Sequence, residues 1–486
     1  MFSEEILNKY DMTIGIECHV QLATNTKLFS GADNDARDKS PNSVVSPIDF
    51  GLPGMLPVLN REAVNLAIKA GKALNAEVAK VSRFDRKHYF YPDLPKGYQT
   101  TQMYHPIILE GYVEAPLEDG NTVKVRVHHA HMEEDAGKLT HFSDHTLVDL
   151  NRAGTPLIEI VSEPDIHSAL EAKAYATELY RLMTYAGVTH GDLYHGNMRF
   201  DVNLSIAPKG VTELGTRAEV KNLNSFKSVE KAAEYEFKRQ VELLEKGERI
   251  IQETRGWDDA KQKTTSQRSK EDAQDYRYMP DADIPPIVLS DEEIAEIQAT
   301  VPKLPSFYRQ SWKTLGLDGT VINALIASRQ TSELVQRIVE KGGESAARRV
   351  ALWFLITTSG EQELDSESSE TDITVSDEQL IELADMVDKN ELSSTAAKDV
   401  FFEMMKSGVS ARDIAEQKNL LQVSDEGAIA SIVDEVLADP SSEKAVADIK
   451  AGNDKVIGFL VGQVMKKSEG KANPELAQKL IRDKLS

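Results

Sequence analysis

The chain has 486 residues, of which 41% are hydrophobic, and its formal net charge is −23 at pH 7. This length exceeds what one hydrophobic core usually serves, and it indicates roughly three domains. The negative charge argues against a protein that coats nucleic acid non-specifically, because phosphate contacts need clustered lysine and arginine.

The N-terminal residues are acidic and lack the basic and apolar regions of a signal peptide. No apolar run reaches the roughly 18 residues that a membrane-spanning helix needs. We therefore expect a cytoplasmic protein that does not enter a membrane. The single cysteine, Cys18, excludes an internal disulfide and a zinc site built from several cysteines.

Residues 12–21 alternate as a β-strand does, with Cys18 on an apolar face and with Glu17 and His19 on the other. Cys18 is therefore expected to be a buried structural thiol. Residues 51–60 contain two prolines and two glycines and are predicted to form an extended loop. An amphipathic helix is predicted over 61–80.

Residues 84–99 form a proline-interrupted segment in which aromatic residues alternate with Arg86, Lys87, His88 and Lys96. Such a segment suits a nucleotide or the end of a nucleic acid, because rings stack on bases while cations meet phosphates. The alternative is a rigid aromatic loop that packs on its own domain.

Two histidines and three consecutive acids lie at residues 129–135, after a strand whose valines alternate over 123–127. Vicinal carboxylates repel one another unless a cation neutralises them, so this group predicts a site for a divalent ion. A solvated acidic turn is the alternative. Strand parity places Glu133 with the histidines and Glu134 on the opposite face, unless a β-bulge turns the second acid around.

Three further strands are predicted, one that carries Glu159, one at 198–206 and one at 216–224. A helix over 168–186, capped by Ser168, follows the first of them. The polar faces of the predicted strands carry acids, amides and cations: Glu17, His19, Glu159, Arg199, Asp201, Asn203, Arg217, Glu219 and Lys221. This mixture is typical of a concave face that binds metal and phosphates rather than of a solvated sheet face.

Residues 226–248 are predicted to form a long helix and residues 254–286 a mostly polar loop region. Almost no strand pattern follows residue 293. The acidic segment 361–372 is predicted to be a mobile surface loop. Short helices are expected at 409–418, 425–438, 442–451, 456–467 and 473–485. From Glu443 onward nine Lys/Arg oppose six Asp/Glu, a balance of +3, which indicates a docking surface.

Six stretches carry a family resemblance: residues 14–19, 84–93, 131–138, 149–159, 219–226 and 458–466. They include IGIECH, HMEEDAGK, EVKNLNSF and GFLVGQVMK, which are long and specific motifs. Essentially end to end, the chain resembles the B subunits of the glutamyl/aspartyl-tRNA amidotransferases (GatB).

The resemblance implies an α+β fold with three domains. An antiparallel-sheet cradle domain, similar to glutamine synthetase, would span 1–293, a helical domain 294–405, and a YqeY-like helical tail that contacts tRNA 406–486. The implied activity uses ATP and magnesium to phosphorylate the side-chain carboxylate of misacylated Glu-tRNA(Gln) or Asp-tRNA(Asn). Ammonia from an amidase-type glutaminase, the A subunit, would then displace the phosphate, with a small C subunit bracing the pair.

The resemblance also implies roles for individual residues. The metal ligands would be His19, Glu134 and Glu159, with Glu17 nearby, while Lys87, Asp201 and Glu219 would line the same pocket. The cations expected to gather the phosphates and their developing charge are Lys87, Arg199, Arg217 and Lys221.

Three alternatives remain at this point: a non-catalytic tRNA-binding scaffold, a metal hydrolase, and an ATP-grasp-like ligase that does not act on tRNA. The sequence contains no glutaminase nucleophile loop of the amidase type, and its only thiol lies on an apolar strand face. We therefore expect the ammonia to come from a partner. Which of the two misacylated tRNAs is used is not evident from the residues.

Overall fold

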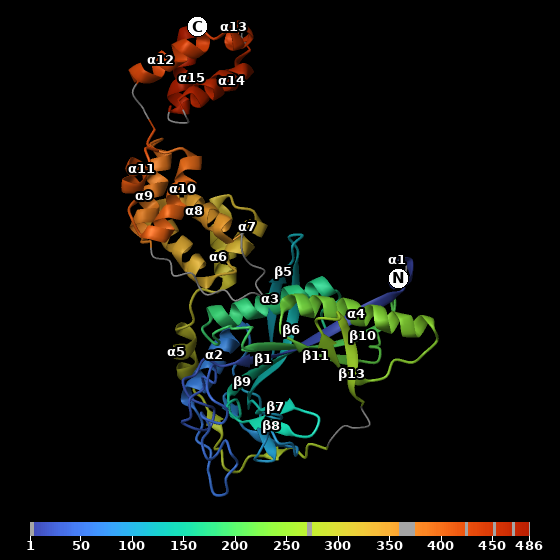
Figure 1. Ribbon diagram of the computed structural model, residues 1–486. Coiled ribbons are helices and arrows are strands. Elements are labelled where there is room, and N and C mark those ends of the chain that lie inside the picture. Colours follow the sequence, from blue (N-terminus) through green and yellow to red (C-terminus); the bar gives the residue numbers. More distant parts are fainter. Residues whose placement is uncertain are drawn as a thin grey trace. The chain divides into compact units, whose positions relative to one another are not determined.

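The computed structural model describes residues 4–269, 275–358, 375–422, 426–450, 453–468 and 472–485 (Figure 1). These residues form two compact units, one up to Phe307 and one from Tyr308 onward. No helix in the described ranges is long and apolar enough to cross a membrane. The predicted mobile loop at 361–372 lies outside the described residues.

The first unit is built on an eight-stranded sheet in the order β13-β12-β11-β10-β1-β9-β6-β5. The strands are β1 (Tyr10–Gln21), β5 (Gly111–Pro116), β6 (Thr122–Glu134), β9 (Pro156–Ser162), β10 (Met198–Pro208), β11 (Ala218–Leu223), β12 (Glu253–Asp258) and β13 (Lys263–Ser269). Neighbours are antiparallel except for the parallel pair β11 and β12. The predicted α+β class with a mainly antiparallel N-terminal sheet is confirmed.

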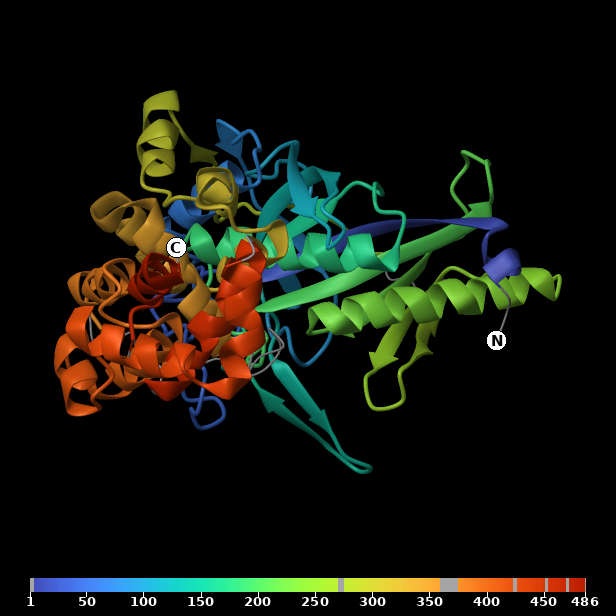
Figure 2. The ribbon, with the colours of Figure 1, turned by 90° about the horizontal axis from the view of Figure 1, so that it is seen from above.

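Two helices, α3 (Ala169–Tyr185) and α4 (Phe226–Glu245), pack side by side on one face of this sheet (Figures 1 and 2). Ser168 and Ser225 cap them by accepting the backbone N–H groups of Glu171 and Ser228. Both predicted helices are confirmed within a few residues. The helices cover the apolar face of the strands and leave the polar side chains on the other face.

β1 shows how the sequence separates the two faces. Ile14, Ile16, Cys18 and Val20 are each at most 1% exposed, and they alternate with half-buried polar residues. Burial raises the pKa of the Cys18 thiol well above its usual value. The prediction of a buried structural cysteine is thus confirmed.

Three small sheets complete the first unit. They are formed by β14 (Met279–Pro280), β3 (Asp85–His88) and β4 (Tyr98–Thr101), by β15 (Ile287–Val288) and β2 (Val81–Ser82), and by β7 (Lys138–His141) and β8 (Thr146–Asp149). Residues 84–99 therefore do not form a single loop. They contain β3 and the beginning of β4, and residues 89–97 connect these two strands. Helices α1 (Glu4–Leu7) and α2 (Arg61–Ala73) also belong to this unit, as does α5 (Asp291–Ala299).

Two predictions of secondary structure are wrong. The helix predicted to reach residue 80 ends at Ala73, because Asn75 adopts a left-handed conformation (φ 49°) and Ala76 N–H donates to Gly71 O over 2.9 Å. The region predicted as polar loop contains β12 and β13. Their apolar alternation is obscured because buried Arg255 of β12 pairs with Glu236 of α4, 3.5 Å away.

In the described residues of the second unit the regular elements after Tyr308 are all helices. Its α-helices are the end of α6 (Pro305–Ser311), then α7 (Gly319–Leu325), α8 (Arg329–Thr358), α9 (Asp377–Asp388), α10 (Ser394–Ser407), α11 (Ala411–Gln417), α12 (Glu426–Leu437), α13 (Glu443–Lys450), α14 (Ile457–Lys467) and α15 (Pro474–Leu485). All five predicted short helices are present. α12–α15 share a hydrophobic core that includes Ile429, Val433, Leu460 and Ile481.

Candidate active site on the polar face of the sheet

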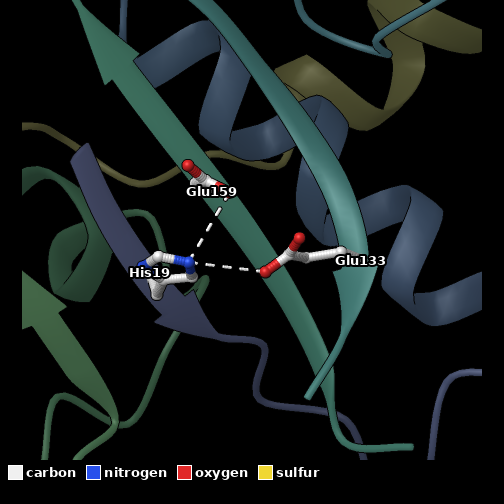
Figure 3. A group of neighbouring side chains, drawn as sticks. All are labelled: His19, Glu133 and Glu159. Atoms are coloured by element: carbon white, nitrogen blue, oxygen red, sulfur yellow. Dashed lines mark ion pairs between the residues drawn. The ribbon is translucent and has the colours of Figure 1, made fainter. Parts of the chain in front are cut away.

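Three side chains from adjacent central strands converge on the polar face: His19 of β1, Glu133 of β6 and Glu159 of β9 (Figure 3). The register places His19 directly opposite Glu159. His19 Nε2 lies 3.5 Å from Glu133 Oε1 and 3.5 Å from Glu159 Oε2. Their potential ligand atoms all lie within 4.8 Å of one another, so one cation can contact all three.

His131 of β6 lies opposite Glu159 in the register and contacts both carboxylates of this cluster. Its Nε2 lies 3.3 Å from Glu159 Oε2 and 3.6 Å from Glu133 Oε2. Burial opposes protonation of His131, but interactions with the two carboxylates outweigh it and raise its pKa to about 10. Burial likewise opposes ionisation of Glu159, yet His131 and His19 hold its pKa well below the usual range. Glu159 is therefore a carboxylate at neutral pH.

Glu134 does not join this cluster. The β-bulge in β6 lies at His128, and the pairing with β9 is regular from His129 to Glu134. Consecutive side chains then face opposite sides, and the Glu134 carboxylate accepts the N–H of Thr100 over 2.9 Å and pairs with Lys96. In this structure it is Glu133, and not Glu134, whose carboxylate faces His19 and Glu159.

A second group of acids lies beside the first. Glu17 of β1, Asp201 of β10 and Glu219 of β11 also place carboxylate oxygens within 4.8 Å of one another. Lys221 Nζ lies 2.8 Å from both Asp201 Oδ2 and Glu219 Oε1, and Asn203 donates to Glu17 Oε1 over 2.9 Å. Burial, followed by the charges of Glu159 and Glu219, raises the pKa of Glu17. Two of the three acids thus pair with one ammonium group.

The predicted phosphate-binding cations differ in their surroundings. Lys87 of β3 is inward-facing: burial lowers its pKa, but the charges of Glu133, Tyr278 and Glu159 outweigh burial and raise it. Arg199 Nη2 donates to Asp135 Oδ2 over 3.0 Å. Arg217 is exposed and immediately precedes β11.

The structure therefore brings most of the predicted site residues to one face and sets Glu134 apart: the residues brought together are Glu17, His19, Lys87, Glu159, Arg199, Asp201, Glu219 and Lys221. Arg217 is exposed, but its charge acts on Glu219. Two residues that the expected site lacked are His131 and Asp135, which contact the acids and Arg199 respectively. The i, i+2 spacing of His131 and Glu133 was the available signal, since it places both on the same strand face.

Comparison with known families gives two matches. Residues 12–295 match the family described as GatB/GatE catalytic domain, and residues 333–485 match the GatB domain.

Curated relatives match along nearly the whole chain. The B subunit of the aspartyl/glutamyl-tRNA(Asn/Gln) amidotransferase of Carboxydothermus hydrogenoformans is 44% identical, over 99% of this chain and 100% of its own. The B subunits of the same name from Persephonella marina and Trichodesmium erythraeum are 45% and 44% identical, over 98% and 99% of this chain and 100% and 98% of their own. The chain belongs to the GatB family.

Proposed function

We propose that this chain is the B subunit of a tRNA-dependent amidotransferase. It would phosphorylate the side-chain carboxylate of misacylated Glu-tRNA(Gln) or Asp-tRNA(Asn) with ATP, and ammonia would then replace the phosphate to give Gln-tRNA(Gln) or Asn-tRNA(Asn). Full-length similarity to proteins of that name supports this function. The single observation that carries the chemistry is the convergence of His19, Glu133 and Glu159 on the polar sheet face.

The donors on this face suit divalent cations. Two carboxylates and one imidazole form the first cluster, and three carboxylates form the second, which matches the preference of Mg²⁺ for oxygen. A bound Mg²⁺ would neutralise charge on the ATP phosphates during transfer. Glu133 and Glu159, with His19, would hold it, and we propose Glu133 in place of Glu134 because only its carboxylate faces the other two.

The chain's own cations would act on the phosphates. Phosphoryl transfer needs little covalent help from a protein, because most of the barrier is lowered by positioning and by charge stabilisation. Lys87 adjoins the first cluster and Lys221 the second, so together they present ammonium groups on both sides of the acids. Arg199 donates a hydrogen bond to Asp135, and it would have to give up this bond to contact the phosphates.

The ammonia would come from a partner. The chain's only thiol, Cys18, is buried on the core face of β1, while its neighbour His19 points to the opposite face, so the two cannot pair as nucleophile and base. We propose that a glutaminase, the A subunit, is the source and that a small C subunit completes a heterotrimer. A tRNA-binding role is proposed for the tail, with domains at 1–293, 294–405 and 406–486.

Transamidation by the purified assembly tests this function. The assembly is incubated with ATP, glutamine, Mg²⁺ and each mischarged tRNA, and the amino acid released from the tRNA is identified. Glutamine or asparagine in place of glutamate or aspartate is the expected product. Phosphate release from ATP that needs no charged tRNA would instead indicate a hydrolase or an unrelated ligase. Amidation that survives loss of both His19 and Glu159 would indicate a scaffold.

A further inference from the structure

Four tyrosines form a continuous row beside Lys87. Tyr89 follows β3, Tyr104 follows β4, and Tyr276 and Tyr278 precede β14. Successive ring centroids are 6.3 Å apart from Tyr89 to Tyr276, 6.0 Å from Tyr276 to Tyr278 and 6.5 Å from Tyr278 to Tyr104, and each pair meets edge to face. We call these four residues the tyrosine row.

The sheet beneath the tyrosine row fixes its position. β3 pairs with β4 on one side and with β14 on the other, and His88 N–H donates to Tyr276 O over 2.8 Å. Arg86 of β3 donates to Asp281 Oδ2 over 2.8 Å and to Asp283 Oδ2 over 2.7 Å, which ties β3 to the chain after β14. The segments that carry the rings are therefore held together before any ligand arrives.

The tyrosine row is partly open to solvent and adjoins the acidic cluster. Tyr104 is 58% exposed and the other three rings are partly buried, whereas aromatic residues of a packed core are closed to water. Lys87 Nζ lies 4.9 Å from the Tyr276 ring centroid, and the same ammonium interacts electrostatically with Glu133 and Glu159. Lys87 thus connects the aromatic surface to the proposed metal site.

We propose that the tyrosine row is a base-stacking site that takes adenine, with the reactive end of the same ligand directed past Lys87 toward His19, Glu133 and Glu159. This inference rests on the proposed function, which supplies two adenine-bearing ligands, ATP and the 3′-terminal adenosine of the charged tRNA. Tyrosine rings stack on bases without needing a specific sequence, and the Lys87 ammonium beside Tyr276 suits a phosphate attached to the same nucleoside.

The test compares ligands that have and lack the base, using the chain in complex with its partner subunits. ATP is compared with inorganic triphosphate, and an acceptor-stem RNA hairpin ending in CCA is compared with one whose last nucleotide is abasic. The variants are Tyr276→Leu, Tyr278→Leu and their Phe counterparts, which keep the ring. Tyr112→Leu on edge strand β5 is the matched control, because Lys124 lies over that ring at 3.8 Å outside the tyrosine row.

Both Leu variants are expected to weaken binding of an adenine-bearing ligand by about 5- to 100-fold, as loss of one stacked base predicts. Binding of the base-free counterpart, the Phe variants and the control should stay at the wild-type level. Weakening confined to ATP assigns the adenine to the nucleotide, and weakening confined to the hairpin assigns it to the tRNA end.

Three results would overturn the proposal: unchanged binding of both adenine ligands, equal loss of the base-free ligands, or failure of the Leu variants to assemble with their partners. A parallel transamidation assay of the wild type separates this inference from the proposed function. If the wild type amidates mischarged tRNA while the Leu variants bind normally, only the stacking site is wrong. If the wild type does not amidate and stacking is still seen, only the proposed reaction is wrong.

Discussion

Exchanging the two neighbouring glutamates of β6 for glutamine, one at a time, should give opposite results. Glu133 and Glu134 have the same side chain and are each 4% exposed, yet they face opposite sides of the sheet. Glu133→Gln removes a charged oxygen ligand from the cluster with His19 and Glu159. Glu134→Gln removes the partner of Lys96 and leaves the cluster intact.

The expected magnitudes follow from these contacts. Loss of a residue that only supports a metal ligand typically costs about 10- to 100-fold in metal affinity. Loss of a ligand charge should therefore weaken Mn²⁺ or Mg²⁺ binding by at least about 100-fold, or about 2.8 kcal/mol, in Glu133→Gln. Its unfolding free energy should change less than that of Glu134→Gln, because Glu133 lies near the acid Glu159 as well as near the cations His131 and Lys87, so that repulsion and attraction offset each other.

Glu134→Gln should instead lower the unfolding free energy. Breaking a buried ion pair by removing one partner typically costs about 3–5 kcal/mol. Lys96 retains some contact with water, and a glutamine can still accept the Thr100 N–H, so we expect about 1–3 kcal/mol here. Metal affinity should change by less than about threefold, since no ligand is lost.

Calorimetric titration with Mn²⁺ and urea unfolding in the absence of metal measure the two quantities. Glu118→Gln, at an exposed position between β5 and β6, is the control for the change of one charge. The assignment of Glu133 would be refuted if Glu134→Gln lost as much metal affinity as Glu133→Gln while its unfolding free energy stayed at the wild-type value.

Removal of residues 426–485 should weaken tRNA binding far more than ATP binding, and filter binding at two salt concentrations measures both. Because α12–α15 have their own core, their removal should leave the rest of the chain folded. Equal tRNA affinity with and without these helices would contradict the proposed tail function. The isolated chain should release no glutamate from glutamine, and activity in a preparation free of other subunits would refute the need for a partner. Iodoacetamide should modify Cys18 only in denaturant, as judged by mass spectrometry, since this thiol is 0% exposed and burial raises its pKa; rapid labelling of the native chain would show that the thiol is accessible.

The sequence predicted the central strands well, because each has a strictly apolar face. In β1 the alternation from Ile14 to Val20 matches the observed burial residue by residue. The same parity placed Glu133 with the histidines, while the family resemblance implied Glu134. The observed bulge lies at His128, before the acids, so simple parity holds where it matters for the site.

Strands with buried charged residues, and contacts between distant segments, were beyond sequence reasoning. β12 escaped prediction because its buried position 255 is an arginine whose partner, Glu236, lies on a helix elsewhere in the chain. In the tyrosine row, Tyr89 contacts Tyr276 and Tyr104 contacts Tyr278. The partners are about 170–190 positions apart in the sequence, and no local pattern reveals such a contact. The roles of Glu17, Asp201 and Glu219 as metal or substrate ligands remain predictions.

Glu17 and His19 belong to different clusters but are two residues apart on one strand. Two residues of extended backbone span about 6.7 Å, and β1 is hydrogen-bonded to β9 on one side and to β10 on the other. The separation of the two clusters therefore cannot adjust without breaking the middle of the sheet. Glutamyl and aspartyl side chains differ in length by one methylene. An enzyme that accepts both must absorb this difference outside the sheet, in the segments around β3, β4 and β14, and selectivity between the two tRNAs should be sought in those segments.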